Sequence, residues 1–157
     1  IIDLGGNRGA FSTLMTNTAE RIVIVECFEQ YEQIIHNNFK NNGFHNYALE
    51  TSFIGEGGMT MSDSQTINMD ELFDRYKLDE VDFIKMDIEG SEFSLFKNAN
   101  WLDRVKALSM EVHAECGNPS IIINILQAKG FAYRTAHENL QEAQGNDQVC
   151  FIYAWKS

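Results

Sequence analysis

The sequence predicts an α/β fold in which seven strands, mostly parallel, form one sheet between two layers of helices and end in an antiparallel hairpin. Short apolar runs alternate with amphipathic helical segments along most of the chain, which is typical of parallel strands joined by crossover helices. Near the end of the chain, two strand-like runs follow each other with a polar segment in place of a helix, and strands joined in this way pair antiparallel. We expect all 157 residues to belong to one domain.

Each element is predicted from its local pattern. Asn68 with Glu71 three residues later is a capping-box pattern, and Asn118 before Pro119 is a second typical helix start. The expected helices start near residues 9, 29, 68, 91 and 118, where apolar residues recur at helical spacing. The first of these helices is expected to bury Ala10, Phe11, Leu14 and Met15. The expected strands cover residues 1–4, 21–25, 46–53, 81–87, 105–113, 131–135 and 149–155, with residues 59–66 as a loop or a weak strand.

A glycine-rich turn joins the first predicted strand to the first helix. Gly5, Gly6 and Gly9 let the chain pass close to a ligand, and the new helix offers unpaired N–H groups. The dinucleotide fingerprint would need a glycine where the chain has Asn7. Asp3 adds a carboxylate, which repels a pyrophosphate and attracts a sulfonium or an ammonium. We therefore expect this loop to bind S-adenosylmethionine rather than a dinucleotide, with an ordinary strand–helix turn as the alternative.

Glu26 follows the second predicted strand. An acidic residue at this strand tip lies where folds of this kind hold the two hydroxyls of a ribose. A solvated loop glutamate is the alternative. In such folds the adenine often lies between the tips of strands two and three, so Phe28 and Phe53 are expected either to flank the base or to belong to the core.

The fourth predicted strand ends in a group of carboxylates, Asp87, Glu89 and Glu92. Like charges held this close are costly unless a cation or a hydrogen-bond network requires them. The alternative is an acidic helix N-terminus, which explains Glu92, partly explains Glu89, and leaves Asp87 unexplained. In the fifth predicted strand, Glu111 and His113 share a face by alternation. A histidine at the carboxyl tip of a central strand, beside a glutamate, is a candidate functional group.

The composition excludes several partners. The net charge is −11, from 12 Lys and Arg against 23 Asp and Glu, which argues against a nucleic-acid partner. No apolar run approaches membrane-spanning length, and no signal peptide is visible at the start of the chain, which looks truncated within the first strand. Cys27, Cys116 and Cys150 lack metal-type spacing, so we expect free thiols in a reducing, cytoplasmic setting.

Two stretches resemble the FkbM family of S-adenosylmethionine-dependent methyltransferases. Residues 2–12, IDLGGNRGAFS, resemble its opening IDvGaNiGxfS, and residues 68–72 with 81–92, NMDEL and VDFIKMDIEGSE, resemble tlDel…vDfiKiDvEGxE. The chain departs from the family in two places. Cys27 and Phe28 follow Glu26 where the family commonly has a proline, and the region of residues 55–64 is short. The resemblance covers nearly the whole chain. It implies the class I methyltransferase fold, a Rossmann-like three-layer sandwich, and O-methylation of a hydroxyl on a sugar, polyketide or similar small molecule.

These inferences define an expected site. The methyl acceptor is expected to contact Glu89, Glu92 and His113, and His113, Asp87 and Glu111 are the expected catalytic residues. His113 would be the general base, with Glu111 fixing its tautomer and Asp87 as the rival base. No metal is expected, with Mg²⁺ on Asp87 and Glu89 as the alternative. The residues expected to bind the cofactor are Asp3, Gly5, Gly6, Asn7, Gly9, Phe11, Glu26, Cys27, Phe28 and Asp87.

Two other functions stay open at this point. The first is an NAD-dependent oxidoreductase of Rossmann type, which the absent second glycine disfavours. The second is a non-catalytic small-molecule binding domain, which turnover of any acceptor would exclude. The expected partner is a hydroxylated small molecule, with no nucleic acid and no membrane, and a homo-oligomer is left open.

Overall fold

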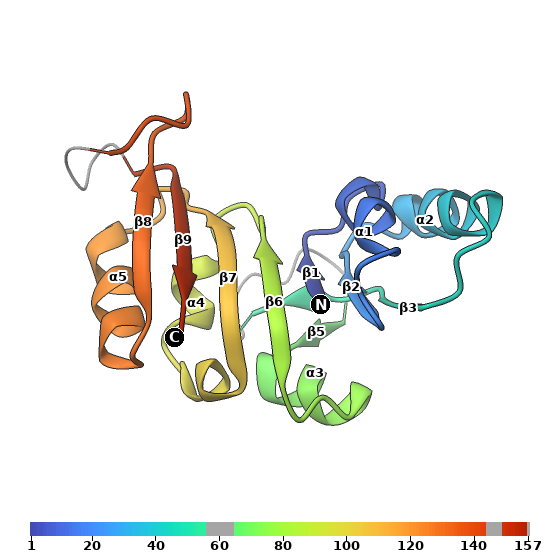
Figure 1. Cartoon of the computed structure of the whole chain (residues 1–157), viewed down its shortest axis with the longest axis horizontal. Helices are drawn as coiled ribbons and strands as arrows, with labels where there is room; N and C mark the ends of the chain where they lie inside the picture. Colours follow the sequence, from blue (N-terminus) through green and yellow to red (C-terminus); the bar gives the residue numbers. More distant parts are fainter. Residues whose placement is uncertain (56–64, 144–148, 157) are drawn as a thin grey trace.

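The computed structural model describes residues 1–55, 65–143 and 149–156, and a seven-stranded sheet runs through its centre (Figure 1). The strand order is β3-β2-β1-β6-β7-β9-β8. Neighbours from β3 to β7 pair in parallel, whereas β9 pairs antiparallel with both β7 and β8. The predicted fold class is therefore confirmed. The strands are β1 (Ile2–Leu4), β2 (Ile22–Val25), β3 (Tyr47–Glu50), β6 (Val81–Met86), β7 (Val105–Glu111), β8 (Ala132–Ala136) and β9 (Phe151–Trp155).

The helices begin close to their predicted starts, and both predicted caps are confirmed. The Glu71 N–H donates to Asn68 Oδ1 over 2.9 Å, and the Asn68 N–H donates to Glu71 Oε2 over 3.0 Å. Asn118 Oδ1 accepts from the N–H of Ser120, with Pro119 in the first turn. The helices are α1 (Ala10–Met15), α2 (Glu29–Asn41), α3 (Met69–Tyr76), α4 (Glu92–Leu95) and α5 (Pro119–Ala128), with a 3₁₀ helix, η1 (Asn100–Arg104), before β7.

Each face of the sheet has its own apolar core. On one face, Ile22 and Ile24 of β2 pack with Ile35 and Phe39 of α2. The opposite face carries a larger core built from β6, β7, α3 and α5 together with the alternate residues of β2. Figure 1 shows α1 and α2 beside the β2 end of the sheet and α5 beside β8. Because β2 is buried on both faces, it is apolar at every position, as parallel strands typically are.

The third predicted strand is wrong beyond Glu50. There β3 ends, and Phe53–Ile54 forms β4, which pairs in parallel with β5 (Thr66–Ile67) in a separate two-stranded sheet. The buried Glu50 carboxylate accepts hydrogen bonds from Ser52 and Arg75, and these contacts turn the chain away from the main sheet. Residues 59–64 of the predicted loop or weak strand lie outside the described residues.

The predicted apolar stripe of the first helix is wrong at Ala10, which is exposed, and at Leu14, which is 79% exposed. Ser12 is the buried residue of α1, and its hydroxyl donates to Asp3 Oδ2 over 2.6 Å. This polar contact sets the rotation of the helix about its axis, so Leu14 faces solvent. Among the described residues, no helix is both long and apolar enough to cross a membrane.

Candidate active site

A cavity of about 340 Å³ opens beside the carboxyl ends of β1, β2 and β6. The chain runs outward from β1 to β2 and β3 in one direction and continues from β6 in the other, so the strand order reverses at this point. Ligands of open α/β sheets bind at such a switch point, and this volume suits a small molecule. The cavity is lined by Gly5, Asn7, Val25, Glu26, Cys27, Phe28, Tyr31, Ser52, Phe53, Ile54, Asp87, Ile88, Glu89 and Ser91.

Gly5 brings the backbone of the glycine loop to the edge of this cavity. Its φ is +76°, and its N–H donates to the Val25 carbonyl over 2.9 Å. A Cβ at this position would lie 1.7 Å from the carbonyl oxygen of Asp87, so the site requires glycine. Because Gly5 has no side chain, a ligand in the cavity can contact its backbone atoms directly.

Glu26 ties the glycine loop to the tip of β2. Its Oε2 accepts from the N–H of Asn7 over 2.7 Å, and its Oε1 accepts from the N–H of Phe28 over 2.9 Å. The residue is only 6% exposed, and it borders the cavity. Because each carboxylate oxygen accepts more than one hydrogen bond, Glu26 keeps the capacity to receive two ribose hydroxyls.

Four residues expected to bind the cofactor do not line the cavity: Asp3, Gly6, Gly9 and Phe11. Asp3 is fully buried beneath the loop, where burial raises the pKa of its carboxyl against the opposing effects of Lys85 and Ser12. The missing side chains of Gly6 and Gly9 leave room for isoleucines of the core behind the loop. Phe11 lies 6.2 Å from Phe83, ring centroid to ring centroid. These four residues support the loop from behind.

Other lining residues were not predicted. Tyr31 meets Phe28 edge to face at a centroid distance of 6.1 Å. The spacing of three residues between them could have revealed this pair, because such residues are neighbours at the start of a helix. No local pattern marks Ser52, Ile54, Ile88 or Ser91. Their positions depend on the β4–β5 pairing and on the turn after β6.

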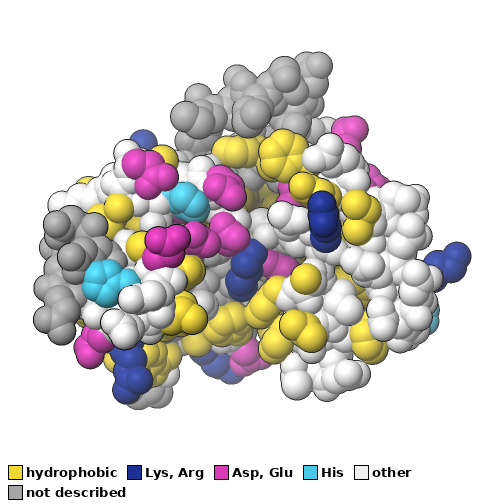
Figure 2. Space-filling model, turned by 90° about the horizontal axis from the view of Figure 1, so that it is seen from above, with side chains coloured by type: hydrophobic (Ala, Val, Ile, Leu, Met, Phe, Trp, Pro, Cys, Tyr) yellow, Lys and Arg dark blue, Asp and Glu magenta, His cyan; other side chains and the backbone are white. Residues whose placement is uncertain are grey.

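A group of acidic residues and one histidine lies beside the cavity at the carboxyl edge of β6 and β7. Figure 2 shows acidic side chains gathered around a histidine there, with a basic side chain next to them. Asp87 and His113 were predicted to lie within strands, and this is wrong: β6 ends at Met86 and β7 ends at Glu111, so both residues lie in the turns that follow. Asp87 and Glu89 line the cavity. We call Asp87, Glu89, Glu111 and His113 the acceptor wall.

Glu92, rather than Glu111, hydrogen-bonds to His113. The Glu92 Oε1 atom lies 2.9 Å from His113 Nδ1, and Glu92 is completely buried. A buried carboxylate cannot reach an acceptor in this conformation, so the expectations that Glu92 contacts the substrate and that Glu111 orients the histidine are both corrected. An ionised carboxylate only accepts hydrogen bonds, so an ionised Glu92 places a proton on Nδ1. In the neutral form of His113 the lone pair is then on Nε2, which is 3.4 Å from Glu89 Oε2.

The surrounding carboxylates shift two pKa values. Burial lowers the pKa of His113, but the hydrogen bond and charge of Glu92, with the charges of Glu89 and Glu111, raise it above its ordinary value. Burial and the neighbouring Asp87 raise the pKa of Glu111, although His113 opposes the shift. The acidic surroundings therefore make His113 a stronger base than a free histidine.

The same wall has the ligand types of a cation site. Three possible ligand atoms lie within 4.8 Å of one another, one each from Asp87, Glu89 and His113. Two carboxylates and an imidazole suit several divalent ions. The Lys85 ammonium lies 3.9 Å from Asp87 Oδ2, so part of this negative charge is already balanced. A bound cation and a free histidine base are competing uses of the same residues.

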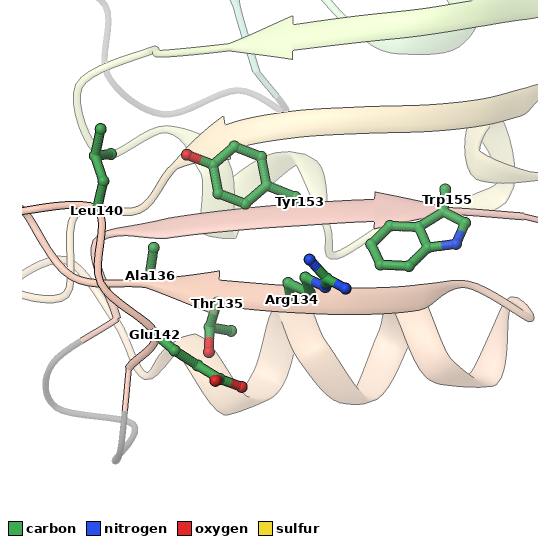
Figure 3. A pocket seen from close by; sticks show the side chains of 7 residues that line it. All are labelled: Arg134, Thr135, Ala136, Leu140, Glu142, Tyr153 and Trp155. Carbon is green, nitrogen blue, oxygen red and sulfur yellow. The ribbon is translucent and has the colours of Figure 1, made fainter.

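A larger hollow of about 820 Å³ lies over β8 and β9, at the sheet edge that is far from the glycine loop. Tyr153 and Trp155 of β9 are 37% and 39% exposed, so this is a hollow on the open face of the hairpin. Its charged residues are Arg134 and Glu142, and Arg134 stands opposite Tyr153 in the strand register (Figure 3). It lacks the backbone cradle and the acceptor wall, so the smaller cavity is the candidate site.

A comparison with protein families identifies the family of this chain. A family model described as the methyltransferase FkbM domain matches residues 11–133. No match was found among curated proteins.

Solved structures share the fold. An FkbM methyltransferase from Methylobacillus flagellatus is 19% identical, with a TM-score of 0.69 over 98% of this chain and 42% of that one. A precorrin-6y C5,15-methyltransferase from Geobacter metallireducens is also 19% identical, with a TM-score of 0.62 over 99% and 79% of the two chains. A putative methyltransferase from Streptococcus mutans in complex with SAH is 11% identical, with a TM-score of 0.65 over 99% and 87%. The present chain thus spans less than half of the Methylobacillus structure.

Proposed function

Because the chain belongs to the FkbM methyltransferase family, we propose that it transfers a methyl group from S-adenosylmethionine to a hydroxyl of a small molecule such as a sugar or a polyketide. One observation carries this proposal. A single cavity is bordered by the glycine loop and Glu26 on one side and by Asp87 and Glu89 on the other. A donor and an acceptor could therefore meet within it, which methyl transfer requires.

The residues of the donor side fit S-adenosylmethionine. Gly5 presents bare backbone, Glu26 has acceptor capacity for the ribose, and Phe28 and Phe53 border the cavity where an adenine would be flanked. The Asp87 carboxylate would face the positive charge of the donor. When bound, S-adenosylmethionine supplies a methyl group on a positively charged sulfur, which is a good leaving group.

The acceptor side must remove the proton of the hydroxyl. In the neutral form of His113, a Glu92 carboxylate that holds the proton on Nδ1 leaves the lone pair on Nε2 to accept the proton of the hydroxyl. After His113 takes up a proton, the carboxylates of Glu92, Glu89 and Glu111 stabilise the resulting positive charge. Asp87 is the rival base, and otherwise it orients the acceptor. Glu89 is 86% exposed at the side chain, which suits a contact with an acceptor that enters from solvent.

Two other functions, an NAD-dependent oxidoreductase and a non-catalytic binding domain, compete with this proposal. Membership of the FkbM family argues against the NAD-dependent oxidoreductase. A non-catalytic binding domain would keep the donor side and lack turnover. Cys27 and Cys116 are free thiols, which agrees with our proposal of a cytoplasmic setting.

The direct test is a screen with isotope-labelled S-adenosylmethionine. Purified protein is mixed with a panel of hydroxylated sugars and polyketides, and with amines and carbon acids as controls. Mass spectrometry then detects the labelled product. Transfer of the labelled methyl group to an oxygen is the expected result. Transfer only to nitrogen or carbon would overturn O-methylation, and donor binding without any transfer across the panel would favour the binding domain.

A further inference from the structure

Lys85 of β6 contacts both sides of the candidate site. Its Nζ donates to the Gly5 carbonyl over 2.6 Å and lies 3.4 Å from the Leu4 carbonyl. The same atom lies 3.3 Å from Asp3 Oδ1 and 3.9 Å from Asp87 Oδ2. The register of β1 and β6 sets Lys85 directly opposite Asp3, which explains how one side chain reaches all four groups.

Balancing the charge of Asp3 does not account for this geometry by itself. Asp3 is fully buried, and a buried carboxylate needs a nearby cation. Yet the shortest contact of Lys85 is to the Gly5 carbonyl, and Asp3 Oδ1 has no hydrogen-bond partner among the described residues. The hydrogen bonds of the ammonium are therefore directed to the carbonyls of Leu4 and Gly5, and Asp3 is held as an ion pair at 3.3 Å.

Gly5 is held on three sides as a result. Its N–H donates to Val25 of β2, its carbonyl accepts from Lys85 of β6, and its Cα lies against the backbone of Asp87. The loop then continues to Asn7, whose N–H donates to Glu26. The Lys85 ammonium thus fixes the position of the glycine loop. The loop lies between the carboxylates of Glu26 and Asp87, which both line the cavity.

We propose that Lys85 is a positioning residue for the methyl donor: it holds the Gly5 carbonyl and the Asp87 carboxylate in the arrangement that receives S-adenosylmethionine. Lys85 does not line the cavity, so it acts through Gly5 and Asp87. The inference rests on the donor side of the proposed function. It depends neither on the identity of the acceptor nor on His113 as the base.

The test compares Lys85→Met, Asp3→Asn and the double variant. Isothermal titration calorimetry gives the dissociation constants of S-adenosylmethionine and of SAH, and thermal unfolding gives Tm. The double variant leaves no unbalanced charge beneath the loop, so its Tm should recover relative to Lys85→Met. Its affinity for both ligands should stay about 10- to 100-fold weaker than that of Asp3→Asn alone, because the charge-assisted hydrogen bond to Gly5 is lost.

The outcomes separate the inference from the proposed function. If the double variant binds both ligands as tightly as Asp3→Asn, Lys85 only balances the buried charge and the inference is overturned. The same holds if Lys85→Met binds them as tightly as the wild-type protein. A wild-type protein that binds neither ligand would overturn both the inference and the proposed function. If Lys85→Met alone does not fold, the comparison of the double variant with Asp3→Asn still decides.

Discussion

Glu92 Oε1 lies 2.9 Å from His113 Nδ1, and the glutamate that makes this contact is completely buried. The buried Glu92 carboxylate contacts Nδ1 of the histidine, and Nε2 lies beside the exposed Glu89. Burying a charge in this way is costly, and such groups concentrate at functional sites. The relationship leads to predictions on the base, its orientation and its pH dependence.

His113→Ala is expected to lower the turnover number by about 10²- to 10⁴-fold, the usual contribution of a general base. The dissociation constant for S-adenosylmethionine should change little, because His113 lies beside Glu89 on the acceptor side and is not among the residues that border the donor. Steady-state kinetics and calorimetry measure the two quantities. His45→Ala, at an exposed position before β3, is the matched control. A His113→Ala protein that turns over at nearly the wild-type rate would transfer the role of base to Asp87.

Glu92→Gln is expected to reduce turnover by about 10²-fold or more, with a nearly unchanged fold. Glu92 Oε1 also accepts from the N–H of Gly90, so the glutamine should keep its amide oxygen at this position and lose only the negative charge. Without that charge the pKa of His113 falls and its protonated form is less stable, which makes it a weaker base. ¹⁵N NMR of the histidine side chains measures this pKa directly. Glu89→Gln serves as the comparison, because its carboxylate contacts the other nitrogen. A pKa and a turnover number that both stay unchanged in Glu92→Gln would contradict the role of Glu92.

The rate of the wild-type protein should rise with pH through a single ionisation above about pH 6.5, the ordinary pKa of histidine. The neutral form of His113 is the active one, and Glu92 from α4, Glu89 from the turn after β6, and Glu111 from β7 outweigh burial and raise its pKa. The stabilising effect of protonated His113 is complete below the unfolded-state pKa and is lost as the pH rises through the higher folded-state pKa. His113→Ala should lack both effects. A wild-type rate that is flat across this range would count against a histidine base.

Gly5→Val should abolish the rise in Tm that S-adenosylmethionine produces. Its Cβ would lie 1.7 Å from the Asp87 carbonyl oxygen, so the glycine loop would have to move away from its place beside the cavity. Gly43→Val is the matched control, because Gly43 also has a positive φ, of +72°, and a Cβ there meets nothing within 4 Å. Glu26→Ala should weaken the ligand-induced shift through the lost ribose hydrogen bonds. A full shift in Gly5→Val would remove the loop from the donor site.

Treatment with a chelator separates the free base from the cation alternative. Turnover should persist in EDTA if His113 acts as a base without a metal. A loss of turnover that Mg²⁺ restores would instead assign Asp87, Glu89 and His113 to a bound ion, whose ligand atoms lie within 4.8 Å of one another. The same experiment on Asp87→Asn checks that any requirement for metal belongs to this site.

Several features of the protein were determined by the sequence alone. The capping box of Asn68 and Glu71, the Asn118 cap and the glycine loop at Gly5 all depend on residues close together in the chain, so their patterns could be recognised. The alternation of strands and helices likewise predicted the parallel sheet and its terminal hairpin. Local conformational preference and hydrophobic spacing are sufficient for features of this kind.

The tertiary structure decided the contacts between distant segments. Glu92 and His113 are 21 positions apart, and Lys85 and Gly5 are 80 positions apart. The rotation of α1 that exposes Leu14 depends on the contact between Ser12 and Asp3, and no apolar spacing reveals it. Such contacts follow from strand order and register, which bring the ends of different strands to one edge of the sheet. Nothing in the neighbouring residues specifies which carboxylate meets which cation or histidine there, because that choice depends on the packing of the whole sheet.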